Sequence, residues 1–455
     1  MQKLLLTLLF LFTSLHIDAQ QNNIDKTPKI GTNRGINTNV PDDNFENYLE
    51  THDANGNTVP LGDATSMGNG IANDDFVLTS RVANITSLII NFPSPPPGQE
   101  VDPATLISDL TGIADFTNLI TLHCDGQLLT LLNISANTKL ENLDCSENQI
   151  SSLVLNSNVQ LKNLDCSGNP VLTLDLSQNI LLENIDVNDC GITNININNN
   201  PALIVLHARN INLTTIDLSL NPNLEELHLN DNLLTGIDLA ANPKIKDLYL
   251  SDNLFLSLDL SLNPIVEVLY LTNNFLSSLD LSSNPKLRVL SVSSNLIATL
   301  DLTANTKIGA LHVNNNRLTS LNLKSGLNTN IYLIYTTGNP DLYCINVDDA
   351  SYSTSNWSNI DGQSYFATNC GSLSTGEFHL LDGLKLFPNP SHSNFQIQGL
   401  NTNVAINIID INGKSILSIK DYTSEAINIS NLSKGVYFVH IATDTGVTTK
   451  KIIKE

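Results

Sequence analysis

Histidine and tyrosine side chains recur at one position of this chain at intervals of 21 residues. Imidazole and phenol rings offer a flat apolar face with a hydrogen-bonding edge, which suits contacts with protein loops or sugars. With two flanking carboxylates, the candidate ligand-binding strip is His207, His228, Tyr249, Tyr270, His312, Glu226 and Asp247. The alternative interpretation is that these rings merely fit the positions of a half-exposed sheet.

Aspartate forms a second row with the same period. Its members are Asp175, Asp217, Asp238, Asp259, Asp280 and Asp301. Carboxylates stacked about 5 Å apart repel one another unless a partner relieves them. We expect each aspartate to accept hydrogen bonds from the following turn or from a nearby serine, and therefore expect no cofactor. Calcium, which favours clusters of oxygen ligands, is the alternative.

Four of the six cysteines fall within the same periodic region. Cys124, Cys145 and Cys166 occupy one position, and Cys190 takes a position that is otherwise asparagine. Identical positions 21 residues apart place side chains in a row, whereas a zinc site needs a tetrahedron. We therefore expect these thiols to pack in the core and expect no metal.

Catalytic motifs are missing from the sequence. It holds no GxSxG, HExxH or phosphate-binding loop. Aspartate rows could supply the paired carboxylates of a glycoside hydrolase, but no nonrepetitive segment is large enough for a catalytic domain. We therefore expect the protein not to be an enzyme.

The composition narrows the choice of partners. The 455-residue chain has a formal net charge of −23, and only 15% of its residues are charged. Nucleic acid and anionic membrane surfaces both require basic patches, so neither is expected as a partner.

A 21-residue repeat accounts for these rows. Asparagine recurs nine times in register, at 137, 158, 179, 200, 221, 242, 263, 284 and 305. Leucine or isoleucine keeps the same period, and each half-repeat alternates like a short strand, as in Leu227-His228-Leu229 and Ile237-Asp238-Leu239. One repeat cannot bury its leucine face alone, so the repeats must stack. We expect asparagine amides to satisfy the turn backbone and to form ladders.

These residues resemble the leucine-rich repeat, in a 21-residue bacterial class with the pattern LxxLx[LC]xxNxLxxLDLxxNxx. Ten units fit from Leu119 to about Leu327, and a degraded one follows to Leu342. The resemblance implies a mainly β solenoid over 119–342 that mediates protein interaction or adhesion, as internalins do. Capture of polysaccharide and a structural envelope role are the alternatives. Few aromatic residues, 5% of the chain, argue against sugar binding.

The segments around the repeats resemble caps. Residues 1–19 have the pattern of a signal peptide, with a membrane anchor as the alternative, and 20–35 are a flexible N-terminus. We expect no transmembrane segment. Residues 36–118 form an N-terminal cap that contains an amphipathic helix with Phe45 and Leu49. Residues 343–371 form a C-terminal cap, in which we expect Cys344 and Cys370 to pair in an oxidising compartment.

After a linker at 372–383, residues 384–455 change character to short alternating strands with Asn-Gly and Lys-Gly turns, which indicate a small β-sandwich. Their motifs resemble the type A C-terminal sorting domain of the type IX secretion system. The motif residues are Pro388, Asn389, Pro390, Gly413, Lys414, Gly435, Tyr437 and Lys451. The resemblance implies contact with the secretion machinery, export across the outer membrane, removal of this domain, and surface attachment or release. A generic adhesive sandwich is the alternative.

Overall fold

The computed structural model describes residues 36–90, 101–326, 328–370, 384–400, 403–411, 414–443 and 446–455. The predicted signal peptide, the flexible N-terminus and the linker at 372–383 lie outside these residues. Internal contacts divide the chain into two units, Met1–Asn223 and Leu224–Glu455. This division falls inside the predicted repeat region, and the predicted domain boundaries remain predictions.

The first unit opens with a cap of short elements. They are β1 (Asn37–Asn39), α1 (Asp43–Thr51), β2 (Phe76–Leu78), α2 (Thr79–Val82), β3 (Ser87–Ile89), η1 (Pro103–Thr105) and η2 (Ile113–Asp115). Asp42 begins α1, because its Oδ1 accepts hydrogen bonds from the backbone N–H groups of Asn44 (3.1 Å) and Phe45 (3.0 Å). Phe45 and Leu49 are fully buried, as the predicted helix required.

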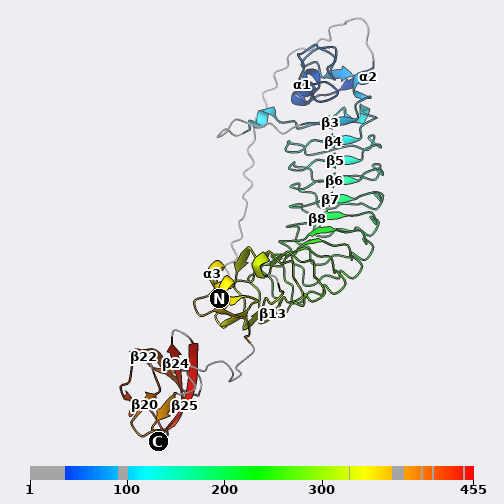
Figure 1. The fold of residues 1–455 in the computed structure, drawn as a ribbon. Helices are drawn as coiled ribbons and strands as arrows, with labels where there is room; N and C mark the ends of the chain where they lie inside the picture. Colours follow the sequence, from blue (N-terminus) through cyan, green and yellow to red (C-terminus); the bar gives the residue numbers. More distant parts are fainter. Residues whose placement is uncertain are drawn as a thin grey trace. The chain divides into compact units, whose positions relative to one another are not determined.

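Three-residue parallel strands follow at each repeat of the first unit. They are β4 (Thr121–His123), β5 (Asn142–Asp144), β6 (Asn163–Asp165), β7 (Asn184–Asp186) and β8 (Val205–His207). Figure 1 shows them stacked in chain order after β3. The middle residue of each strand is a buried leucine or isoleucine, and the residues on either side are half-exposed.

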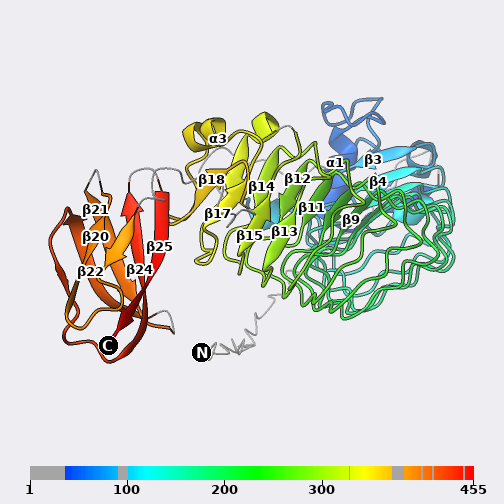
Figure 2. The same ribbon diagram turned by 60° about the horizontal axis from the view of Figure 1, so that its bottom comes forward.

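The second unit continues the same pattern along the chain. Its first set of parallel strands is β9 (Glu226–His228), β10 (Asp247–Tyr249), β11 (Val268–Tyr270), β12 (Val289–Ser291), β14 (Ala310–His312) and β16 (Leu333–Tyr335). A separate parallel sheet contains β13 (Thr299–Asp301), β15 (Ser320–Asn322), β17 (Cys344–Asn346) and β18 (Tyr365–Ala367), with η3 at Asn328–Asn330 and α3 at Ala350–Asn356. Figure 2 shows these neighbouring strands side by side.

The prediction for the second half of each repeat was wrong in most units. We expected a strand there in every unit, yet 237–239 form none, and pairing of this half begins only at β13. The aspartate does not explain the difference, because Asp301 accepts the N–H of Thr303 just as Asp238 accepts that of Ala240, yet Asp301 lies in β13.

The predicted disulfide between Cys344 and Cys370 is present, with Cα atoms 5.7 Å apart. It ties the start of β17 to the chain beyond β18. Trp357, which is buried beside α3, donates from Nε1 to the carbonyl of Ile331 at 3.1 Å. Both contacts hold the last coils together.

Residues from Leu384 onward form two antiparallel sheets, which confirms the predicted sandwich. The strands are β19 (Lys385–Phe387), β20 (Asn394–Gln398), β21 (Val404–Ile409), β22 (Ser415–Tyr422), β23 (Ile427–Asn428), β24 (Gly435–Thr443) and β25 (Gly446–Lys454). The sheet orders are β19-β20-β23 and β22-β21-β24-β25. Phe395 and Ile397 of the first sheet share a core with Ile406, Val439 and others of the second.

None of the helices in the described parts of the chain has both the length and the apolar character to cross a membrane.

Candidate ligand-binding surface

The third residues of the second unit's strands form a row of rings. We define the aromatic row as His228, Tyr249, Tyr270, His312 and Tyr335. Parallel pairing sets His228 opposite Tyr249, and Tyr249 opposite Tyr270. The His228 and Tyr249 ring centroids are 4.1 Å apart, and the Tyr249 and Tyr270 rings stack at 5.0 Å with only 10° between their planes. The first four rings are half-buried and Tyr335 is exposed, so the row offers ring edges and hydroxyl groups to a ligand.

Ser291 interrupts the row, which resumes at His312. The structure adds Tyr335, which pairs with His312 and meets its ring edge-on at 5.0 Å. Sequence reasoning missed Tyr335 because it lies 23 residues after His312, where the 21-residue period breaks. Its register in β16 is visible only from strand pairing.

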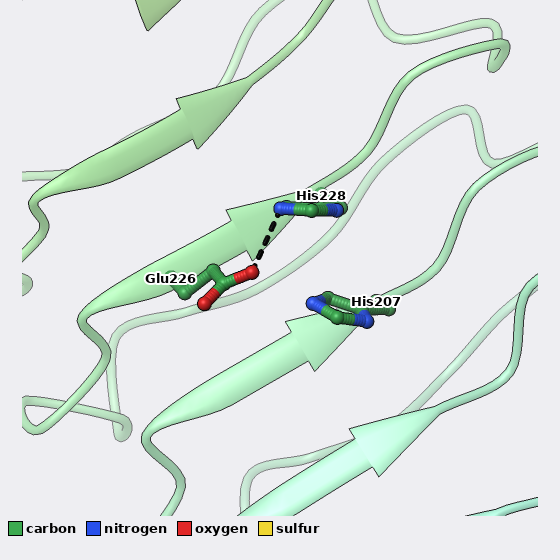
Figure 3. A group of neighbouring side chains, drawn as sticks. All are labelled: His207, Glu226 and His228. Carbon is green, nitrogen blue, oxygen red and sulfur yellow. Dashed lines mark ion pairs between the residues drawn. The ribbon is translucent and has the colours of Figure 1, made fainter. Parts of the chain in front are cut away.

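Carboxylates lie along the same strands. Glu226 Oε1 and His228 Nε2 are 3.0 Å apart on β9, an ion pair that Figure 3 marks with a dashed line. His207, also drawn there, belongs to β8, where its Nδ1 lies 3.0 Å from Asp186 Oδ2. Both histidines thus have an acidic partner that orients the ring.

Asp247 lies among other carboxylates on this surface. Burial, then the charges of Glu226 and Glu267, raise the pKa of Asp247. Burial and the neighbouring Asp247 likewise raise the pKa of Tyr249, so its hydroxyl stays protonated and can donate. The surface therefore combines neutral donors with a local excess of carboxylate, which favours a cationic group on the ligand.

A charge ladder, which the sequence analysis did not identify, runs just before the strands of the second unit. It consists of Glu225, Lys246, Glu267 and Arg288. Lys246 Nζ lies 2.6 Å from Glu225 Oε2, and Arg288 lies 3.5 Å from Glu267. The sign of the charge alternates every 21 residues, so charges of the same sign recur every 42 residues, and this longer period could have revealed the ladder in the sequence. Exposed pairs of this kind add little stability.

The first unit carries a polar hollow instead of rings. A depression of about 470 Å³ is lined by carboxylates and amides from β5, β6 and β7 and by the apolar side chains of Leu143, Leu164, Ile185 and Val205, with His123 and His207 at its ends. Its amides form a ladder, in which Asn184 donates to Asn163, and Asn163 donates to Asn142, both at 2.5 Å. Burial, then the charges of Asp186 and Asp144, raise the pKa of Asp165.

The second-half aspartates have the structural role that we expected. Oδ1 of Asp175, Asp259 and Asp280 each accepts the backbone N–H two residues on, at 2.9–3.0 Å. These hydrogen bonds from Ser177, Ser261 and Ser282 lower the carboxyl pKa values. The turns thus use one carboxylate oxygen of each aspartate.

The four repeat-region cysteines are buried and unbridged, as predicted. Burial raises the pKa of the Cys124 and Cys145 thiols, which are therefore inert as nucleophiles. Cys190 Sγ donates to the carbonyl of Cys166 at 3.1 Å. In the preceding coil Asn169 donates to Cys145 in the same way at 2.9 Å, so the thiol replaces one bond of the missing asparagine.

One acidic group in the cap has metal-ligand spacing. Carboxylate oxygens of Asp43, Glu46 and Asp75 lie within 4.8 Å of one another. Glu46 is fully buried, and its two oxygens accept from the backbone N–H groups of Asp74 (3.0 Å) and Asp75 (3.1 Å). That carboxylate is already engaged in joining α1 to the loop before β2.

The sorting motifs occupy the C-terminal sandwich. Asn389 contacts β25 through its side chain, Lys414 closes a turn with Asp410, and Tyr437 is buried with its hydroxyl donating to Ser433. Pro388, Pro390, Gly435 and Lys451 are exposed. Gly413 lies outside the described residues.

Both the repeat region and the C-terminal domain are similar to known proteins. Residues 385–455 match the family model of the secretion system C-terminal sorting domain. The functional domain of InlJ from Listeria monocytogenes, described as including a cysteine ladder, is 19% identical with a TM-score of 0.58, over 92% of this chain and 99% of that one.

A second similar structure is the internalin inlF from Listeria monocytogenes strain 4b F2365. It is 19% identical with a TM-score of 0.51, over 71% of this chain and 94% of that one. A comparison with curated proteins found no match. At these identities the likeness shows the fold alone. The chain therefore combines a leucine-rich-repeat solenoid with a C-terminal sorting domain, which indicates type IX secretion to the cell surface or extracellular space.

Proposed function

We propose that this protein is an extracellular binding protein whose aromatic row, with Glu226 and Asp247, contacts a protein ligand after export. The observation that carries this proposal is the run of ring contacts in which His228 meets Tyr249 at a tilt of 53° and Tyr249 stacks on Tyr270. Rings held by their neighbours lose little conformational entropy when a ligand binds, so their contact area converts efficiently into affinity. Removal of the sorting domain on maturation remains part of the proposal.

The chemistry of the ligand follows from the charges near the row. Asp247 and Glu226 lie on the strands of Tyr249 and His228. A basic side chain of a protein ligand would relieve their repulsion. An interaction protein needs no catalytic group, which agrees with the expectation that the chain is not an enzyme.

Polysaccharide capture is the second candidate, and the polar hollow of the first unit favours it. Carboxylates and amides there could bond sugar hydroxyls. However, the residues that line the hollow include no tyrosine, tryptophan or phenylalanine, which sugar sites commonly use for stacking. We therefore prefer a protein ligand.

The experiment is binding of the full chain to an array that holds extracellular proteins and polysaccharides, with and without calcium. A protein partner bound equally in both buffers supports the proposal. A glycan partner moves the site to the second candidate, and the absence of any binding would leave a structural envelope role. Binding only with calcium would overturn the turn role of the aspartates.

A further inference from the structure

Motifs of the sorting domain that lie far apart in sequence meet in space. Ile409, next to Asp410, pairs with Phe438, and Phe438 pairs in turn with Lys451. Asn389 reaches the same strand: its Nδ2 donates to the Lys451 carbonyl at 2.6 Å, and its Oδ1 accepts from the Ile453 N–H at 2.9 Å. Four separate segments thus converge along β21, β24 and β25.

The contacts of Asn389 also complete the end of β25. Ser391 N–H donates to the Ile453 carbonyl at 2.8 Å, and Glu455 N–H donates to the Ser391 carbonyl at 3.0 Å. Residues 389–391 therefore hold the last residues of an edge strand that would otherwise leave these backbone groups unpaired.

The face of this sheet that points away from the core carries an apolar patch, which we define as Ile409, Val436, Phe438 and Ile453. Alternation along β24 buries Tyr437 and Val439 and turns Val436 and Phe438 outward. Val436 is 37% exposed, and the other three are half-buried. Pairing of Val436 with Ile453 and of Phe438 with Ile409 makes the patch continuous across three strands.

The charge of the sorting domain differs from that of the rest of the chain. Residues 385–455 contain seven lysines and five acidic residues, a net charge of +2 in a chain of −23. Lys451 lies directly opposite Phe438 and is exposed, and Lys434 immediately precedes β24. An apolar surface with lysines at its rim fits a partner that is apolar at its centre and acidic at its edge.

We propose that the apolar patch with Lys451 is the surface through which the sorting domain docks on the type IX export machinery, at an apolar site bordered by carboxylates. Asn389 contributes by fixing the end of β25. The proposal rests on the sorting domain and not on the ligand-binding function of the repeats, so either can fail alone.

The test is export of the full chain from a bacterium with a working type IX system, measured as the fraction that reaches the surface or medium. Lys451→Glu and Val436→Glu each place a carboxylate against an acidic rim, and each should lower that fraction at least about fivefold, the loss of a modest interface contact. The precursor should accumulate in the periplasm. Lys420→Glu, the same charge reversal on exposed β22, should be exported like the parent.

Thermal unfolding and protease resistance of the purified full chain separate docking from misfolding. Unchanged unfolding with lost export supports the proposal. Parental export of both patch variants, or equal loss with Lys420→Glu, would overturn it. Two further results would also overturn the proposal. If the purified parent binds phosphatidylglycerol vesicles and Val436→Glu abolishes that binding, the patch contacts lipid. If the parent self-associates and Val436→Glu abolishes the self-association, the patch contacts a second copy of the chain.

Discussion

At the scale of single residues, asparagine holds the coils of the solenoid together. Asn158 is fully buried, and its Nδ2 donates at 3.0 Å to the carbonyls of Ile134 and Asn137, which belong to the preceding coil. The side chains of the second asparagine series both donate and accept hydrogen bonds. Asn274 donates to Leu250 and Leu271 and accepts from the Phe255 N–H at 3.0 Å. Leucine could fill the space but would leave these backbone groups unpaired.

Asn200 provides a matched test of this role beside Asn199. Asn200 is buried and donates to the carbonyls of Asn179 (2.8 Å) and Leu176 (3.2 Å), whereas Asn199 is exposed and donates to the Ser177 carbonyl at the longer distance of 3.4 Å. Asn200→Ala should lower the free energy of unfolding by about 1–3 kcal/mol, because buried carbonyls lose their donor. Asn199→Ala should change it by less than about 0.5 kcal/mol. Equal effects in chemical denaturation would contradict the account.

His312 should make stability depend on pH. Burial lowers its pKa in the folded protein below the ordinary value of about 6.5. The unfolded chain therefore binds the proton more readily, and this contribution to stability is lost as pH falls from about 6.5 through the lower pKa of the folded protein. Between about pH 7.5 and 5.5, the parent should lose more unfolding free energy than His312→Gln. Parallel pH profiles for the two proteins would show that the ring is not shielded.

The burial of some charged side chains could not be predicted from the sequence. Glu46 and Glu50 are fully buried on α1, although their type and charge assign them to its exposed face. They are buried because backbone N–H groups of the loop before β2 bond both carboxylates, a contact with no periodic signal. By contrast, the position of Tyr249 followed from the repeat alone.

At the scale of elements, three-residue strands are stable here because each pairs with identical neighbours. Leu248, for example, lies between Leu227 and Leu269 in exact register with both. Periodicity predicted these strands and the buried leucines. It also predicted second-half strands that mostly do not form, since a two-residue alternation cannot tell a hydrogen-bonded strand from an extended segment without strand pairing.

The disulfide should secure the last coils. Cys344 and Cys370 are 26 residues apart, and a loop of that length gives about 3 kcal/mol through chain entropy. Replacing both with serine should lower the denaturant midpoint of the repeat region, and dithiothreitol should lower that of the parent to the same value. If the reductant has no effect on the parent, the bridge is not what stabilises this end.

At the scale of the whole molecule, the proposed binding surface and the sorting domain are separated along the sequence. The aromatic row lies between residues 228 and 335, and the sorting domain covers 385–455. The resemblance of the C-terminal motifs predicted the second of these, while the ligand could not be predicted because a fold does not specify its partner.

Loss of the sorting domain should therefore abolish export without altering the repeats. A chain that ends at residue 371 should remain in the periplasm of a type IX-competent bacterium, measured by fractionation. Once purified, it should bind the ligand of the parent with the same dissociation constant. Secretion of the shortened chain would contradict the assignment of the sorting role to this domain.

The central claim is tested most directly by the dissociation constant of a captured protein ligand for the parent and for His228→Ala with Tyr249→Ala. The account predicts at least a tenfold weakening in the double variant, as for a modest hot spot, with unchanged thermal unfolding. The control variant, Tyr343→Ala with Tyr365→Ala, removes two exposed rings outside the aromatic row and should bind like the parent. Unchanged affinity in the double variant, or equal weakening in the control, would contradict the account.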